Sequence, residues 1–473
     1  MINRKAQILL PFFLFFILLT IYVSNHFFYW DTIKLVAAPA HFFYGNNFST
    51  LITPEDIDAG HFPLLAMYIA KVWQLFGKSL VVAHFAMLPF LLGIVYQVYA
   101  LAKYFLGATT WMIWAMVLVL ADPTFLSQAT MVSPDIVLVF CFFMAVNAIL
   151  NNKKTWLFIA VLILFLISMR GLIAAFIILW IDVIYTLRKQ YFRGFPLHML
   201  LMKAAFYVVP LMVFLSYQIY HYNQTGWVWS SPDSDWAEGR TTNDFKGAFY
   251  NIGIFGWRIL DFGRALPMVI LIVMLFKFRR KLFSEQYSSK MIVLFFTTGI
   301  MSLIPFLYFE YLTNHRYILP LIMLLLLIFV FYTTKAISSS RIKTGIFSIS
   351  LISLLLGNFW VYPEKIAQGW EASLAHLPFY NLQLEMNNYL DEHKIPYHEV
   401  GTTFPILGKH DVIFLNDDNR AFQSKNVGKD KYVLYSNSMN DFSDKEIELL
   451  HADYQVVKTL NSPTVYIQLF ERK

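Results

Sequence analysis

The sequence predicts an α-helical polytopic membrane protein that carries a mixed α/β domain at its C-terminal end. Of the 473 residues, 58% are hydrophobic and only 14% are charged, whereas charged residues make up about 25% of an ordinary soluble domain. A water-soluble fold must cover its surface with polar groups. The composition therefore excludes a soluble globular enzyme, a disordered chain and a nucleic-acid-binding domain.

Apolar runs define the membrane part of the chain. A spanning helix needs about 20 mostly apolar residues, and about eleven runs approach that length. Some are short, and the long run 155–187 is divided at Arg170-Gly171, where a charge interrupts it. Because Ser24-Asn25-His26 offers no small-residue cleavage site, we expect the first run to be a retained anchor rather than a signal peptide. The eleven runs lie near 7–28, 79–102, 108–122, 134–150, 155–169, 171–187, 199–221, 264–278, 291–311, 316–334 and 344–362.

Basic residues between these runs predict the orientation. With a cytoplasmic N-terminus, eleven spans put all the basic clusters on the cytoplasmic side, as the positive-inside rule requires. The net charge of +7 then reflects topology and not a surface for nucleic acid. The single cysteine, Cys141, and an outer domain without disulfides favour a bacterial inner membrane. The clusters are Arg4/Lys5, Lys153/Lys154, Arg188/Lys189/Arg193, Lys277/Arg279/Arg280/Lys281 and Lys335/Arg341/Lys343.

Three stretches fall on the outer side in this topology, namely 29–78, 222–263 and the tail 363–473. The tail has 11 basic and 16 acidic residues, a net charge of −5, against +12 for the rest of the chain. This shift predicts a transmembrane module over 1–362 and a soluble α/β domain over 363–473. In the tail, 379–393 has helical spacing and Ser443 to Glu446 forms a capping box that opens a second helix. Runs rich in Val, Ile, Tyr and Phe predict strands at 411–415, 432–435, 454–457 and 464–470.

The first outer loop gathers ionisable residues. Tyr29 and Trp30 are typical of the membrane interface, so they put Asp31 at the bilayer surface. Further on, Pro54–Leu64 holds Glu55, Asp56, Asp58 and His61. Asp31 is either a helix-capping or solvated residue or a catalytic one. The later acids are interpreted first as solvated loop residues, and His61 as a loop residue or a contact for phosphate or metal.

Further charges stand at the outer ends of spans. Asp122 and Asp135 bracket Pro123–Pro134, Arg170 interrupts an apolar run, and Glu310, His315 and Arg316 surround the start of the tenth run. Ionisable groups at membrane depth are costly and are usually paired or functional. Arg170 either forms a salt bridge with Asp122 or Asp135, or binds a phosphate near the headgroups, and a guanidinium suits phosphate oxygens. We favour the phosphate.

The order of several motifs carries a family resemblance. They are Asp31, His61-Phe62-Pro63-Leu64, Ala121-Asp122-Pro123 through Ser133-Pro134-Asp135, Arg170-Gly171 and His315-Arg316-Tyr317-Ile318-Leu319-Pro320. This series, over most of residues 1–340, resembles the GT-C class of membrane glycosyltransferases, in particular the branch of protein O-mannosyltransferases and the bacterial lipid A aminoarabinose transferase. Two positions depart from that pattern: Thr32 stands where a second acid is frequent, and Phe62 replaces the first proline of a Pro-Pro pair.

The resemblance implies the GT-C fold and a hexosyl- or pentosyltransferase that uses a sugar carried on a polyprenyl phosphate. The acceptor is a glycan, a lipid or a protein on the extracytoplasmic side. Asp31 would act as general base in an inverting transfer. The donor phosphate would be bound by Arg170, Arg316, His61 and His315, with Asp58, Asp56, Asp135, Asp122 and Glu310 as supporting acids. The resemblance assigns no definite cofactor, and a divalent metal held by Asp58 and His61 is an open alternative.

Two other classes of function compete with this interpretation. A transporter or lipid flippase would use the intramembrane charges as a substrate path, and a receptor or assembly factor would use the tail to bind a partner. An enzyme should bring Asp31, Arg170 and Arg316 to one outward-facing cavity. The outer loop 225–261 contains Trp227, Trp229, Trp236 and Trp257, which either anchor the loop at the interface or stack on a sugar or acceptor.

Overall fold

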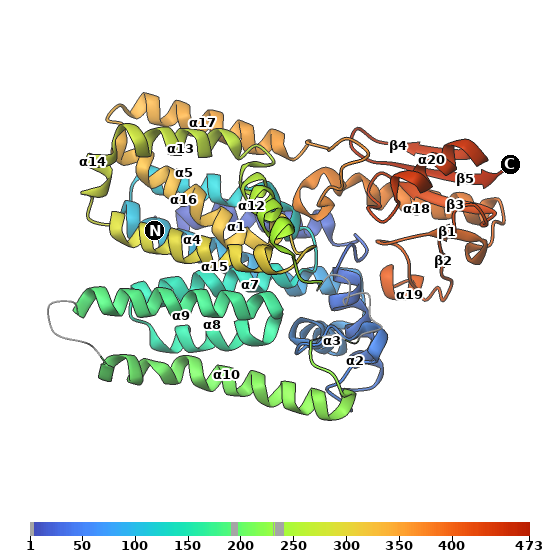
Figure 1. Cartoon of the computed structure of the whole chain (residues 1–473), viewed down its shortest axis with the longest axis horizontal. Coiled ribbons are helices and arrows are strands. Elements are labelled where there is room, and N and C mark those ends of the chain that lie inside the picture. Colours follow the sequence, from blue (N-terminus) through green and yellow to red (C-terminus); the bar gives the residue numbers. More distant parts are fainter. Residues whose placement is uncertain (1–3, 191–196, 230, 232–240) are drawn as a thin grey trace.

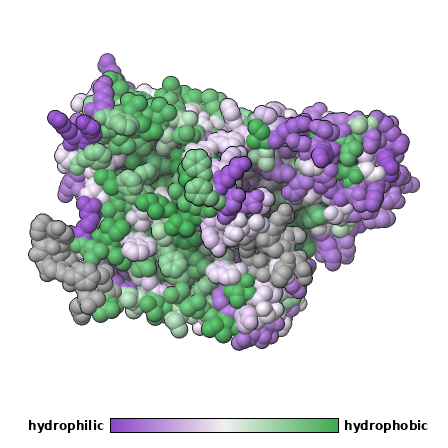
Figure 2. Space-filling model, in the orientation of Figure 1, coloured by the Kyte–Doolittle hydropathy of each residue, from purple (hydrophilic) through white to green (hydrophobic). Residues whose placement is uncertain are grey.

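The chain folds into a long helical bundle with a smaller α/β unit at one end (Figure 1). The structure, a computed structural model, describes residues 4–190, 197–229, 231 and 241–473. On the face shown in Figure 2, the bundle is mainly hydrophobic and the α/β unit mainly hydrophilic. A hydrophobic bundle surface is typical of a multi-pass membrane protein.

A helix occupies each of the eleven predicted apolar runs. Among the described residues, seven helices are long and apolar enough to cross a membrane, or nine if each of two bent pairs is one span, while α7 and α8 are shorter. The eleven helices are α1 (Arg4–Val23), α4 (Leu80–Leu106), α5 (Thr110–Leu120), α7 (Pro134–Leu150), α8 (Lys154–Ile167), α9 (Met169–Gln190), α10 (Leu197–Thr225), α13 (Ala265–Lys277), α15 (Ser288–Tyr308), α16 (Leu319–Ala336) and α17 (Ser340–Gly357).

Three helix breaks occur at the end of the bundle beside the α/β unit. Helix α5 bends by 66° into α6 (Pro123–Ala129), and α12 (Phe245–Leu260) bends by 100° into α13. The predicted division of 155–187 is confirmed within two residues, because Ser168 separates α8 from α9. Gly171 permits this tight break, since a Cβ there would lie 2.0 Å from the Leu164 carbonyl oxygen. A short helix, α14 (Arg279–Phe283), follows α13.

Helix α16 is the central helix of the bundle and is almost entirely buried. It packs against α5, α13 and α15. A short 3₁₀ helix, η4 (His315–Ile318), leads directly into it. The residues of η4 therefore lie in the middle of the end of the bundle that faces the α/β unit.

The first outer loop lies at the same end as the α/β unit (Figure 1). It contains η1 (Ile33–Ala37), α2 (Ala38–Gly45), η2 (Glu55–Ile57) and α3 (Leu64–Phe76). Helix α2 packs along α3, and α3 packs on α4. The loop is thus a compact helical cap, and Asp31 stands where the chain enters it.

The C-terminal unit contains a five-stranded mixed sheet with the order β2-β1-β3-β5-β4. Strand β1 is parallel to β2 and β3, while β5 is antiparallel to β3 and β4. The predicted capping box of Ser443 and Glu446 is present. The strands are β1 (Val400–Thr402), β2 (Gln423–Ser424), β3 (Tyr432–Ser436), β4 (Tyr454–Asn461) and β5 (Tyr466–Arg472), and the helices are η5 (Trp370–Ala372), η6 (Leu374–His376), α18 (Pro378–Glu392), η7 (Tyr397–Glu399), α19 (His410–Ile413) and α20 (Asp444–Asp453).

One strand prediction is wrong. The run 411–415 does not join the sheet, because His410–Ile413 forms the short helix α19. Its end docks on the loop after α1: the Phe28 amide donates to the Ile413 carbonyl at 3.1 Å, and the Phe27 and Phe414 rings lie 4.6 Å apart. Tertiary packing against another part of the chain therefore decides the conformation of this apolar run.

Candidate active site

Asp31 lies in a tight turn that follows α1. The Tyr29 amide donates to the Thr32 hydroxyl at 3.0 Å, and that hydroxyl donates to the Tyr29 carbonyl at 2.6 Å. Trp30 has a positive φ of 57° in this turn. Thr32, which replaces the second acid of the resemblance, thus fixes the backbone of Asp31. The Asp31 side chain is 21% exposed.

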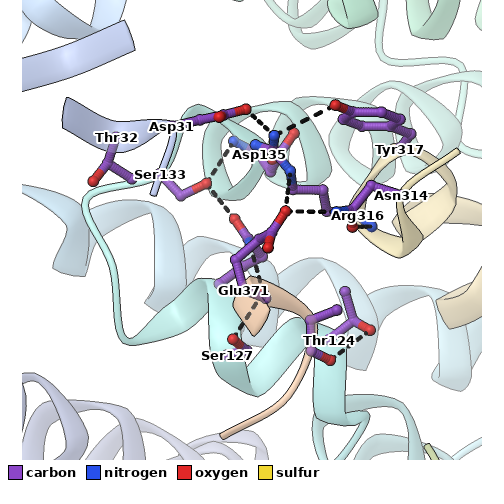
Figure 3. A network of polar contacts seen from close by, with 12 residues as sticks. Asp31, Thr32, Thr124, Ser127, Ser133, Asp135, Asn314, Arg316, Tyr317 and Glu371 are labelled. Carbon is purple, nitrogen blue, oxygen red and sulfur yellow. Dashed lines mark hydrogen bonds and ion pairs between the residues drawn. The ribbon is translucent and has the colours of Figure 1, made fainter. Parts of the chain in front are cut away.

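Arg316 reaches Asp31 from η4. Its Nη2 pairs with Asp31 Oδ2, its Nη1 lies 3.3 Å from Asp135 Oδ2, and its Nε lies 3.2 Å from Glu371 Oε1 (Figure 3). The guanidinium is only 5% exposed. Burying one cation against three carboxylates offsets its desolvation and fixes its orientation.

Arg170 is the second guanidinium of the cluster. Its Nη1 lies 2.5 Å from Asp135 Oδ1, and its side chain is 18% exposed. The Tyr317 ring is shared between the two arginines, with its centroid 4.7 Å from the Arg170 Cζ and 5.1 Å from the Arg316 Cζ. The salt bridge to Asp135, one of the two alternatives for Arg170, is therefore present. Arg170 also lines a cavity beside the cluster.

A cavity of about 670 Å³ adjoins this cluster. Asp31, Arg170 and Arg316 line it, together with His61 from the first outer loop. Its remaining wall is mainly apolar and is built from α7, α9, α15 and the start of α16. The apolar wall includes Leu138, Phe142, Ile173, Phe176, Ile177, Pro305, Phe306, Phe309 and Pro320. The cavity thus combines a few charged side chains with a mainly apolar wall.

Trp229 also lines this cavity, with Ala59 and Thr242. A Cβ at Gly60, where φ is +70°, would lie 1.8 Å from the Trp229 carbonyl oxygen. Glycine at position 60 therefore permits the close approach of the two outer loops. Trp236, considered with Trp229 in the sequence, lies outside the described residues.

Several predicted site residues lie elsewhere. Asp122 is fully buried and pairs with Arg264, with 2.6 Å between Asp122 Oδ2 and Arg264 Nε. His315 is also buried, and its Nε2 lies 2.8 Å from Asp261 Oδ2. Neither residue lines the cavity. Asp122 is therefore not a supporting acid at the cavity, and His315 is not a ligand for a phosphate bound there.

The acids of the outer loops are also separate from the cluster. Asp56 and Glu310 are exposed and do not line the cavity. Asp58 is buried and turned toward α10, where its Oδ2 lies 3.1 Å from His221 Nε2. His221, on α10, was not recognised in the sequence because it has no charged neighbour in its apolar run. Of the supporting acids, only Asp135 belongs to the cluster.

The proposed metal pair finds no further ligand in the described ranges. No group of three or more His, Cys, Asp or Glu side chains that could hold a metal ion occurs there. Asp58 instead accepts from the Gly60 amide at 2.8 Å, and the Nδ1 of His61 lies 3.1 Å from the Phe62 carbonyl oxygen. These contacts organise the loop backbone, and the mechanism proposed below uses no metal.

Comparison with solved structures identifies the fold. ArnT from Cupriavidus metallidurans bound to undecaprenyl phosphate matches with a TM-score of 0.54 and 12% identity over 98% of each chain. The arabinofuranosyltransferase AftD from Mycobacteria matches with a TM-score of 0.51 and 11% identity, over 99% of this chain and 40% of that one. The chain has the GT-C fold. The apo form of ArnT also matches, with a TM-score of 0.50. No family model and no curated protein sequence matches the chain.

One residue of the cluster comes from outside the membrane module of this GT-C fold. Glu371, in η5 of the C-terminal unit, contacts Arg316 and accepts from Asn314 Nδ2 at 2.6 Å through its Oε1 (Figure 3). Nothing in the sequence marks Glu371, because an acid in an acidic soluble tail carries no signal of burial. Only the folded structure sets Glu371 apart from the other acids of the tail, because the residue is 1% exposed there.

Proposed function

We propose that this protein is an integral-membrane inverting glycosyltransferase that moves a sugar from a polyprenyl-phosphate donor to an acceptor on the extracytoplasmic side. One observation carries the proposal: Asp31, Arg170 and Arg316 line a single cavity whose other walls are mainly apolar. An acid beside two guanidiniums suits proton abstraction next to an anionic leaving group, and the apolar wall suits a lipid.

The donor class follows from the two kinds of residue that line the cavity, charged and apolar. Guanidinium groups bind phosphate oxygens through paired hydrogen bonds. Ile173, Phe176 and Ile177 of α9 continue from Arg170 as an apolar surface, on which an isoprenoid chain would lie beside its phosphate. The similar fold of ArnT, a protein whose structure holds undecaprenyl phosphate, supports a donor of this kind.

The residues suggest the following division of labour. The Asp31 carboxylate accepts the proton of the acceptor hydroxyl or amine, whose oxygen or nitrogen forms a bond to the anomeric carbon. The bond from that carbon to the phosphate oxygen breaks, and the electron pair leaves with the polyprenyl phosphate. Attack from the face opposite the leaving group inverts the anomeric carbon. Arg170 and Arg316 stabilise the charge that develops on the phosphate.

The pairing of Asp31 with Arg316 fits a resting site. A donor phosphate that engages Arg316 competes with Asp31 for the guanidinium, because both are anions. Release of Asp31 from this pair leaves the carboxylate ready to accept a proton from the acceptor. Donor binding would thus prepare the base, and His61, which also lines the cavity, would provide a further contact for the phosphate.

The proposal includes a topology. The basic clusters favour a cytoplasmic N-terminus in a bacterial inner membrane, with residues 1–362 as the transmembrane module and 363–473 as an extracytoplasmic domain. The start of α1 and the end of α13 lie at the bundle end opposite the α/β unit (Figure 1). Lys5 belongs to the first turn of α1, and Lys277 is the last residue of α13. The site then opens toward the extracytoplasmic acceptor, which is a glycan, a lipid or a protein.

The test uses purified protein, a panel of radiolabelled polyprenyl-phosphate sugars and a membrane acceptor extract. We expect at least one of these donors to label a product, and mass spectrometry of that product identifies the sugar and the acceptor. Nucleotide sugars serve as the control and should give no label. A product labelled only from a nucleotide sugar would contradict the proposal. Movement of the donor lipid between the leaflets of proteoliposomes without any labelled product, as a flippase predicts, would contradict it as well.

A further inference from the structure

Glu371 connects the C-terminal unit to the charged cluster. Its Oε1 lies 3.2 Å from Arg316 Nε and 2.6 Å from Asn314 Nδ2. Asn314 also accepts from the Arg316 amide at 3.3 Å and so caps η4. Glu371 therefore contacts both Arg316 and the residue that begins its helix (Figure 3).

The backbone of Glu371 is fixed by the membrane module. Helix α6 donates two hydrogen bonds to the Glu371 carbonyl, from the Ser127 hydroxyl and the Gln128 amide, each at 2.8 Å. The Thr124 hydroxyl donates to the next carbonyl, that of Ala372, at 3.0 Å. Three side chains of one short helix thus hold η5 against the bundle. With its main chain held in this way, Glu371 has little freedom to follow Arg316 if the arginine moves.

We propose that Glu371 is a positioning residue of this site: it holds the Nε side of the Arg316 guanidinium so that the terminal nitrogens face Asp31 and Asp135. By this contact the C-terminal unit completes the site and sets the charge that an incoming phosphate meets. The inference rests on the proposed function in one respect, because it takes the cavity as the site of a phosphate-linked lipid.

The charges of the cluster support this role. Asp31, Asp135 and Glu371 are three acids beside the two cations Arg170 and Arg316. Burial raises the pKa of Glu371 to about 7, although the Arg316 guanidinium opposes this rise. Its Oε2 has no hydrogen-bond partner in the described part of the chain and is available to hold a proton. With Glu371 protonated, the two remaining carboxylates balance the two guanidiniums.

Other groups also act on Glu371 from the elements packed around it. They are Arg316 and Tyr317 of η4, Asp31 and Tyr29 of the turn after α1, Asp135 of α7 and Arg258 of α12. A phosphate bound at Arg316 adds a negative charge and favours the protonated form of Glu371. Above about pH 7 the site must take up a proton when it binds the phosphate. Affinity in the wild type should therefore fall as the pH rises through this value.

The experiment measures binding of undecaprenyl phosphate to the full-length protein in nanodiscs between about pH 5.5 and about pH 8.5. Glu371→Gln keeps the length of the side chain and one oxygen near Arg316 but cannot ionise. Its matched control is Glu448→Gln, an exposed acid of the same unit that pairs with Lys365 at 3.1 Å. The lipid phosphate itself titrates at about pH 6, but it does so equally in every variant. The ratio of the wild-type Kd to the variant Kd therefore reports the contribution of Glu371 to the pH dependence of binding.

We expect that ratio to rise by at least about fivefold across the pH range for Glu371→Gln and to stay flat for Glu448→Gln. Asn314→Asp provides a second variant. It keeps the acceptor that caps η4 and places a negative charge beside Glu371. The pH at which affinity for the lipid falls should therefore move upward. The transfer assay of the proposed function is run in parallel on the same preparations.

The inference would be overturned if the Kd of the wild type and that of Glu371→Gln depended on pH in parallel, and if the pH at which affinity falls were the same in Asn314→Asp as in the wild type. The proposed function would survive that result if the wild type still binds the lipid and transfers sugar. A wild type that does not bind undecaprenyl phosphate would overturn both. The two failures are therefore distinguishable on one set of samples.

Discussion

The carboxylate of Asp31 is paired with the guanidinium of Arg316, although 285 positions separate the two residues in the chain. The turn after the first span and the 3₁₀ helix before a late span meet at the end of the bundle beside the α/β unit. Their meeting point borders a mainly apolar cavity, and Arg170 lines the same cavity from a third element, α9. The predictions below test the separate parts of this arrangement.

Arg170→Ala should weaken binding of the donor lipid by at least about tenfold. A charge-assisted contact to phosphate is worth about 1.5–3 kcal/mol, and the variant also leaves Asp135 with one cation fewer. Titration with undecaprenyl phosphate measures the effect. The matched control is Arg188→Ala, an exposed arginine near the other end of α9. An unchanged Kd for Arg170→Ala would make the Asp135 pair purely structural.

Ser302→Phe should also weaken donor binding by about tenfold, because it extends an aromatic ring from α15 into the cavity. Ser302 is buried and lines the cavity, whereas Ile300 of the same helix is 59% exposed. Ile300→Phe is therefore the control for helix stability and should bind normally. Equal affinities in the two variants would show that the lipid does not use this cavity.

Asp122→Ala should destabilise the protein by about 3–5 kcal/mol, because removal of one partner leaves the buried Arg264 without its counter-ion. Asp122 also caps α6 by accepting from the Phe125 amide at 3.1 Å. Thermal unfolding in nanodiscs measures the loss, and Glu310→Gln, an exposed acid, should unfold like the wild type. Replacing the pair together, as Asp122→Ala with Arg264→Met, should recover part of the loss. A stable Asp122→Ala would contradict this structural role.

Much of the bundle was predictable because apolar runs determine membrane helices almost alone. The eleven predicted runs all coincide with helices, and the charge that interrupts 155–187 marks the break beside Arg170. A charge in an apolar run is costly, so Asp135, Arg170 and Arg316 were recognisable as residues that need partners.

Pairing over long separations was not predictable. His315 and Arg316 are adjacent in the sequence, yet they contact Asp261 and Asp31 on different sides, because a 3₁₀ helix turns consecutive side chains by about 120°. Arg264 gave no signal as the partner of Asp122, since the two meet only through the bend between α12 and α13. Glu371 was hidden for the opposite reason: it comes from a polar tail, where an acid is the ordinary residue.

The comparison of Asp31→Asn with Asp56→Asn tests the central claim most directly. Both substitutions remove one carboxylate from the first outer loop, but only Asp31 lines the cavity. Initial rates of sugar transfer from a radiolabelled polyprenyl-phosphate donor should fall by about 10²–10⁴ for Asp31→Asn, the range for loss of a general base. Asp56→Asn should keep the wild-type rate, and both variants should remain folded and membrane-inserted. Transfer at the wild-type rate by a folded Asp31→Asn protein would contradict the account.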